Sequence, residues 1–102
     1  MKKIINGKKY NTATAKEIGT WYSETNYSDD NYYEETLYMK KTGEFFFCGY
    51  GGGLSPYAQT CGENQWSGGS AIIPISRTEA RWWIEEHMPA ETYEEVFGPV
   101  EE

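Results

Sequence analysis

Residues 35–54, ETLYMKKTGEFFFCGYGGGL, constrain the fold more than any other part of the chain. Two segments rich in β-branched and aromatic residues flank a Lys-Thr-Gly tripeptide at 41–43, and such residues pack better on a pleated strand than on a helix. A three-residue loop requires a positive φ only at Gly43, which glycine adopts without steric cost. The sequence therefore predicts a β-hairpin over residues 35–50.

This loop also determines which side chains of the hairpin share a face. Successive residues of a strand point to opposite sides of the sheet, so one face of the hairpin is apolar and the other is aromatic but partly polar. We expect the second face, with Tyr38 and Phe46, to be an exposed ledge. The side chains expected in the core are those of Leu37, Met39, Phe45 and Phe47.

The other segments predict an α+β fold, and 102 residues suffice for a single domain spanning residues 1–102. Asn6-Gly7 favours a tight N-terminal hairpin, and Pro74 favours an edge position for its strand. Apolar residues at helical spacing predict two helices, the second capped by Ser76 with Glu79. The expected fold is a small antiparallel sheet (N-terminal hairpin, central hairpin 35–50, edge strand 70–75) packed against two helices (about 12–22 and 77–88). Residues 57–69 are expected to form a loop.

Charge is distributed unevenly along the chain. Sixteen acidic residues against nine basic ones give a net charge of -7. Residues 1–16 hold five lysines and no acid, whereas residues 85–102 hold seven glutamates and no Lys or Arg. We expect residues 90–102 to form an acidic C-terminal tail with one helical turn around 93–97. Because phosphate binding normally needs clustered Lys or Arg, the excess of acid disfavours direct binding to nucleic acid.

The sequence also bears on the compartment in which the protein acts. Met1-Lys2-Lys3 resembles the start of a signal peptide, but the apolar stretch that follows ends at Ile5. No run approaches the roughly eighteen apolar residues of a membrane span. We therefore expect a cytoplasmic protein with no membrane partner.

Residue patterns typical of catalysis or of metal binding are absent from the sequence. His87 is the only histidine and lies on an apolar helix face, while Cys48 and Cys61 lack the close spacing of zinc ligands. The glycines of 49–53 lack the Gly-Lys-Ser/Thr ending of a phosphate-binding loop. We expect no catalytic residue, metal or cofactor; the alternative is an enzyme with a small-molecule pocket near 49–53.

Two surface features are candidates for binding a partner protein. Residues 23–34, SETNYSDDNYYE, place tyrosines among acids, a mixture favoured in recognition loops; alternatively, the rings fold back onto the core. Trp82 lies off the apolar stripe of its helix beside Glu86, as an interface anchor would; alternatively, it covers a neighbouring loop. The candidate partner-binding residues are Tyr27, Asp29, Asp30, Tyr32, Tyr33, Glu34, Trp82 and Glu86.

Short motifs spread over almost the whole chain carry a family resemblance. They are Ile5-Asn6-Gly7-Lys8 with Tyr10, Thr12 and Ala15, Glu35-Thr36-Leu37-Tyr38, Gly43-Glu44, Gly51-Gly52-Gly53, Ile73-Pro74-Ile75, Glu79-Ala80 and Trp83. This pattern resembles small accessory proteins of Firmicutes phages and mobile elements. Some small acidic proteins of this setting are anti-CRISPR or other anti-defence proteins, which block a host effector. The resemblance supplies no functional motif to transfer residue by residue.

These observations lead to two hypotheses of function. The first is a non-enzymatic inhibitor whose partner is a host defence effector protein, with a Cas9-type CRISPR nuclease as the leading candidate. Its carboxylates would replace phosphates in a basic nucleic-acid-binding groove. The alternative is an accessory or structural homo-oligomer, such as a homodimer, that pairs through the ledge of Tyr38 and Phe46.

Overall fold

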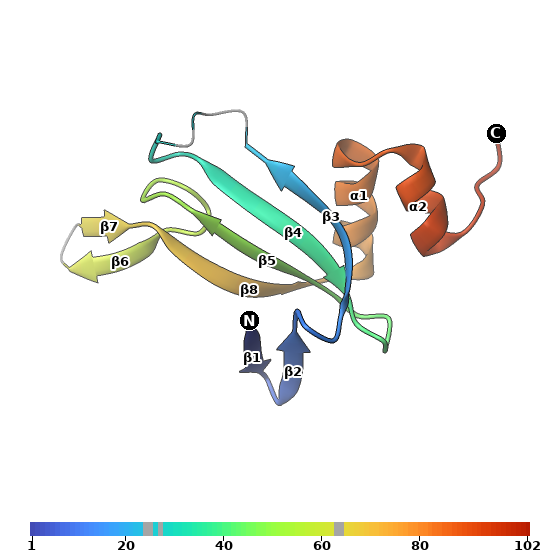
Figure 1. The fold of residues 1–102 in the computed structure, drawn as a ribbon, viewed down its shortest axis with the longest axis horizontal. Helices are drawn as coiled ribbons and strands as arrows, with labels where there is room; N and C mark the ends of the chain where they lie inside the picture. The colour runs from blue at the N-terminus through green and yellow to red at the C-terminus, as the bar shows by residue number, and fades with distance from the viewer. Residues whose placement is uncertain (24–25, 27, 63–64) are drawn as a thin grey trace.

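The structure is a computed structural model and describes residues 1–23, 26, 28–62 and 65–102. Four antiparallel strands form its main sheet in the order β3-β4-β5-β8, and two short hairpins form sheets of their own (Figure 1). Two helices follow the last strand, so the predicted α+β fold is confirmed. The elements are β1 (Lys2–Ile5), β2 (Lys8–Asn11), β3 (Lys16–Tyr22), β4 (Tyr33–Met39), β5 (Phe45–Gly51), β6 (Gln59–Gly62), β7 (Gln65–Ser67), β8 (Gly69–Ile75), α1 (Arg77–His87) and α2 (Ala90–Phe97).

The central hairpin of β4 and β5 has the predicted register. Met39 pairs with Phe45 and Leu37 with Phe47, and Gly43 has a φ of 92°. The N-terminal hairpin is confirmed as well, with positive φ at both residues of its Asn-Gly turn, as a type I′ turn requires. Strand β8 lies at an edge of the main sheet, where Pro74 is tolerated.

The helix expected at about 12–22 is wrong, because residues Lys16–Tyr22 form strand β3 along the outer edge of β4. Residues 12–15 form a turn, in which the side chain of Asn11 accepts a hydrogen bond from the backbone N–H of Ala13 at 3.0 Å. Strand β3 is rich in β-branched and aromatic residues, and its Thr20 hydroxyl bonds that of Thr36 across the strands at 2.8 Å. Three apolar residues have a helical spacing by coincidence. Pairing with β4 stabilises the strand more than this spacing stabilises a helix.

Two segments of the second half are more ordered than the sequence predicts. Residues 57–69, expected as a loop, contain the hairpin of β6 and β7. The acidic tail contains helix α2, which is longer than the single turn expected. It ends at Gly98, whose φ of 89° and backbone N–H bond to the carbonyl of Glu94 close the helix.

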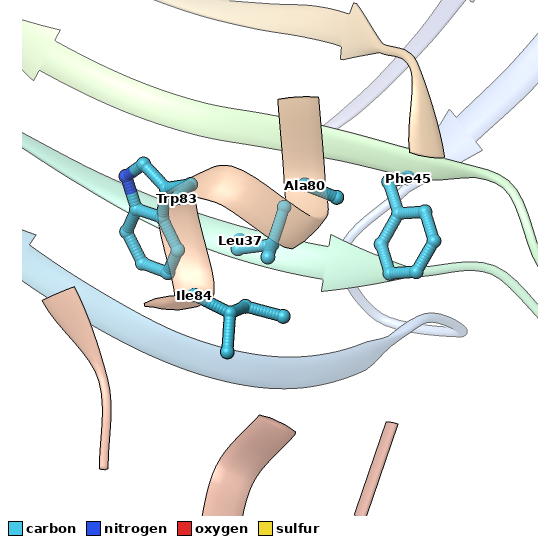
Figure 2. Close-up of a cluster of buried hydrophobic side chains, with 5 residues drawn as sticks. All are labelled: Leu37, Phe45, Ala80, Trp83 and Ile84. Carbon is cyan, nitrogen blue, oxygen red and sulfur yellow. The ribbon is translucent and has the colours of Figure 1, made fainter. Parts of the chain in front are cut away.

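Helix α1 packs on one face of the main sheet and forms the first core cluster. Leu37 and Phe45 of the sheet contact Ala80, Trp83 and Ile84 of the helix, and all five side chains are buried (Figure 2). Three partly buried side chains of helix α2 pack against this cluster. They are Tyr93, Val96 and Phe97.

The opposite face of the sheet is not the exposed ledge that the sequence predicts. The hairpin of β1 and β2 covers the part of this face around Phe46, which is 0% exposed. The rings of Tyr10 and Phe46 meet edge to face with centroids 5.4 Å apart, and Tyr38 stacks on Phe46 at 5.3 Å. Phe46 is therefore occupied within the chain, whereas Tyr38 is only half-buried. Homo-oligomer formation stays a prediction.

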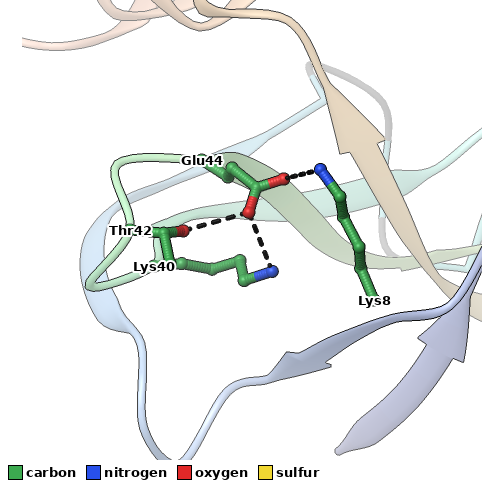
Figure 3. Close-up of polar contacts among 4 residues, drawn as sticks. All are labelled: Lys8, Lys40, Thr42 and Glu44. Carbon is green, nitrogen blue, oxygen red and sulfur yellow. Dashed lines mark hydrogen bonds and ion pairs between the residues drawn. The ribbon is translucent and has the colours of Figure 1, made fainter.

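A carboxylate fastens this hairpin to the turn between β4 and β5. Glu44 accepts hydrogen bonds from Lys8 at 2.9 Å, Lys40 at 3.2 Å and Thr42 at 3.0 Å (Figure 3). These bonds, first that from Lys8, lower the pKa of Glu44 to about 2. Because Lys8 lies on β2, the cluster ties the N-terminal hairpin to the main sheet.

Candidate protein-docking surface

The outer side of α1 presents an exposed tryptophan among carboxylates. The helix begins at Ser76, whose hydroxyl accepts a hydrogen bond from the backbone N–H of Glu79 at 3.1 Å. Trp82 is 59% exposed, because the buried stripe of the helix consists of Ala80, Trp83 and Ile84. Residues three and four positions apart are neighbours on a helix surface, so exposed glutamates surround Trp82. They are Glu79, Glu85 and Glu86.

The Trp82 ring is supported from below by a row of aromatic rings. It meets His87 edge to face with centroids 6.1 Å apart, and His87 stacks on Trp21 of β3 at 4.2 Å with an interplanar angle of 26°. Trp21 contacts Tyr33 at 5.5 Å, and Tyr33 contacts Tyr57 at 6.2 Å. The row links the helix surface to the sheet.

Glu35 anchors the same region beneath α1. Its carboxylate accepts hydrogen bonds from the Tyr57 hydroxyl at 2.6 Å and from the Trp83 indole N–H at 2.9 Å. Burial, and then the bond to Glu35, raise the pKa of Tyr57. Sequence reasoning missed this site. The available signal was a carboxylate at a core-facing position of the strand, two residues before Leu37.

An apolar hollow of about 430 Å³ adjoins this surface between α1 and α2. Glu85, three residues after Trp82, lines it, so this glutamate lies between the tryptophan and the hollow on the helix surface. The remaining lining residues are Ile84, Met88, Pro89, Ala90, Tyr93, Glu94 and Val100. We call Trp82, its three neighbouring glutamates and this hollow the acidic helical surface.

Charge on this side of the molecule is strongly negative. From α1 to the C-terminus eight glutamates, all exposed, stand against only Arg77 and Arg81. Both guanidinium groups lie over the ring of Phe97, at 4.8 and 5.1 Å from its centroid. The two cations therefore support the packing of α2 and leave most of the negative charge uncompensated.

Among its described residues, the loop between β3 and β4 contributes two exposed acids, Asp29 and Asp30. The Asp29 carboxylate accepts hydrogen bonds from the backbone N–H and the side-chain amide of Asn31, at 2.7 and 3.0 Å, and the backbone bond contributes most to lowering the pKa of Asp29. The carbonyl of Asp30 accepts a bond from the N–H of Leu54 at 2.8 Å, which fastens the loop to the glycine-rich segment. Tyr27 lies outside the described residues.

The other three candidates in this segment are less exposed than a free loop would leave them. Tyr32 is 8% exposed, and its hydroxyl donates to the Glu34 carboxylate at 2.8 Å, so this ring folds back onto the protein. Tyr33 and Glu34 are the first residues of β4 and are half-buried.

The fold brings Trp82 and Glu86 together on α1. Asp29 and Asp30 lie apart from them, in the loop that joins the end of β3 to the start of β4 (Figure 1).

In the part of the chain that the structure describes, no three metal-ligating side chains of His, Cys, Asp or Glu gather at one point. Within that same part, no helix is long and apolar enough to cross a bilayer. Comparisons with protein-family models, with curated proteins and with solved structures find no match to this chain.

Proposed function

We propose that this protein is a non-enzymatic binding protein that docks its acidic helical surface on a basic surface of a partner protein. The observation that carries the proposal is Trp82, which is 59% exposed and whose ring meets His87 edge to face, while His87 stacks on Trp21. An exposed tryptophan has a large rigid ring with few rotatable bonds, and such rings dominate many interfaces.

The charge around Trp82 specifies the chemistry of the partner. Carboxylates attract a surface rich in Lys and Arg and repel nucleic acid, and opposite potentials speed the encounter of two proteins. The hollow between α1 and α2 offers room for an apolar side chain of the partner next to Glu85 and Glu94. The partner surface that fits is therefore cationic with at least one protruding apolar group.

The sequence resemblance to phage and mobile-element proteins adds a partner class to this chemistry. A nucleic-acid-binding groove of a host defence nuclease is cationic, and we propose a CRISPR effector, first a Cas9-type nuclease, as the partner. Occupation of the groove by carboxylates would exclude nucleic acid and inhibit the enzyme. The proposal also places the protein in the host cytoplasm.

Two matched pairs of charge reversals test where the partner docks. Glu85→Lys with Glu86→Lys alters the acidic helical surface, whereas Asp29→Lys with Asp30→Lys changes the net charge equally at the distant loop. We expect the first pair to slow association and abolish inhibition of DNA cleavage by a guide-loaded Cas9-type nuclease, because the reversed charges repel the groove. Trp82→Ala should act mainly on dissociation, by roughly 1–3 kcal/mol.

Melting temperatures of all variants are measured first, to establish that each variant is folded. Exposed charge reversals should change the free energy of unfolding by no more than about 0.5 kcal/mol. If the loop pair abolishes binding while the α1 pair leaves it intact, the docking surface is the β3–β4 loop. If binding to basic effectors is indifferent to ionic strength, the carboxylates do not stand in for phosphates. Absence of binding to any nuclease of the class would refute the proposed partner.

A further inference from the structure

The fold gathers all the lysines of the chain at the end of the molecule that carries the N-terminal hairpin. Five lie within the first sixteen residues, and the turn between β4 and β5 brings Lys40 and Lys41 beside them. Sequence order separates these two lysines from the others by more than twenty residues. Only the closure of the hairpin onto the sheet makes them neighbours, as the contact between Lys8 and Glu44 demonstrates (Figure 3).

Two adjoining hollows lie among these lysines. One of about 150 Å³ and one of about 380 Å³ share Thr14, Ala15, Lys40 and Lys41 in their walls. Lys9 lines the first and Lys16 the second. Among the described residues no carboxylate lines either hollow, although acids outnumber bases in the chain by sixteen to nine.

Two acids lie near these lysines: Glu17, which follows Lys16 on β3, and Glu44, which is already engaged. Glu44 bonds Lys8 and Lys40, and Lys40 is held further by its ammonium group lying 4.3 Å from the centroid of the Tyr10 ring. The Lys40 side chain is only 16% exposed and is thus fixed in the wall. Lys9, Lys16 and Lys41 are exposed and, within the described chain, take part in no ion pair. Among the described residues, three lysines outside any ion pair therefore line concave space.

We propose that these hollows form a site for the phosphate groups of an anionic ligand. Lysine ammonium groups act as point charges for phosphate, and the side-chain amide N–H of Asn11 can donate a hydrogen bond to its oxygens. The net charge of the chain opposes this only weakly, since charges beyond about 8 Å are largely screened at physiological ionic strength. The site is independent of the acidic helical surface, because it is built from the hairpin and the β4–β5 turn.

Phosphate groups of this kind occur in free polyphosphate anions and in nucleic-acid backbones, and two probes distinguish them. Binding of a fluorescently labelled single-stranded oligothymidylate is followed by anisotropy, and binding of inorganic triphosphate by amide chemical shifts, both at low and at physiological ionic strength. We expect shifts confined to residues around Lys9, Thr14 and Lys41. Binding of triphosphate alone assigns the site to free anions, and binding of the oligonucleotide assigns it to a backbone.

A matched pair of variants separates a site from general attraction. Lys9→Gln with Lys41→Gln should weaken binding about fivefold and reduce the slope of log affinity against log salt for the oligonucleotide by about 1.4, or 0.7 per contact. Lys2→Gln with Lys3→Gln removes the same charge from β1, outside the hollows, and should change binding less than about twofold. Equal weakening by both pairs, or no binding of either probe at low ionic strength, would overturn the proposal.

Discussion

Substitution of Gly49 by Ala tests how closely the Tyr57 ring approaches the sheet. A Cβ on Gly49 would lie 2.5 Å from the hydroxyl oxygen of Tyr57 and 2.7 Å from its Cε1, closer than non-bonded atoms come. Tyr57 is 4% exposed, so the ring has little space into which it can move. The added methyl group must displace the ring and with it the hydroxyl that bonds Glu35.

Two costs follow from this displacement. Inserting a methyl group into a packed site costs about 1–3 kcal/mol. Breaking the bond between the Tyr57 hydroxyl and the Glu35 carboxylate costs a further 1.5–3 kcal/mol, roughly, because the acceptor is charged. Together they reduce the free energy of unfolding by roughly 2.5–6 kcal/mol in Gly49→Ala. For a domain of this size each kcal/mol lowers the melting temperature by about 4–8 °C.

Urea and thermal unfolding, followed by tryptophan fluorescence and circular dichroism, measure this loss. Tyr57→Leu provides the control background, because it removes the ring that the new methyl group would strike. In that background Gly49→Ala should be neutral or stabilise by up to about 1 kcal/mol, since alanine restricts the unfolded chain more than glycine does. If Gly49→Ala costs the same in both backgrounds, the two residues are not coupled and the reasoning fails.

Two further predictions concern the other face of the sheet. Phe46→Ala should cost about 3–5 kcal/mol in urea unfolding, because it empties the space between the sheet and Tyr10; an exposed ledge would lose far less. The pKa of Glu44 in the folded protein, about 2, lies below its ordinary value of 4.5, so its contribution to stability is present above pH 4.5 and is lost as the pH falls towards 2. The melting temperature of the wild type should therefore exceed that of Glu44→Gln at neutral pH. This difference should disappear as the pH falls from about 4.5 to 2. A difference that is constant with pH would show that the ionised Glu44 does not stabilise the fold through Lys8 and Lys40.

Local chemistry determined the turns and the long helix of this protein. Gly43 and the Asn6-Gly7 pair adopt the positive φ values that their turns require, and the register of the central hairpin follows from the first of these. Ser76 caps α1 through a hydrogen bond to a residue three positions away. Each of these features depends on neighbours in sequence, so each can be predicted without the tertiary structure.

Pairing between strands made residues Lys16–Tyr22 a strand, where the sequence predicted a helix. Three apolar residues between 15 and 22 fit a helical spacing, but the outer edge of β4 offers a ladder of backbone hydrogen bonds to residues Lys16–Tyr22. Gly19 then lies against Met88, where a Cβ would collide with the thioether sulfur. Neither the edge nor the methionine is near in sequence, so periodicity alone could not weigh them.

The candidate sites divide in the same way. The exposure of Trp82 can be predicted from the sequence, because its helical position falls outside the apolar stripe. The stack of His87 on Trp21 cannot, because these two residues lie far apart in the chain. The lysine-lined hollows depend on the hairpin of β1 and β2 folding over Phe46, which brings residues of the N-terminus against the turn at Lys41. Net charge, a sum over the sequence, predicts repulsion of phosphate everywhere. Only the tertiary structure places Lys40 and Lys41 beside the five lysines near the N-terminus, and electrostatic potential depends on distance in space and not on distance along the chain.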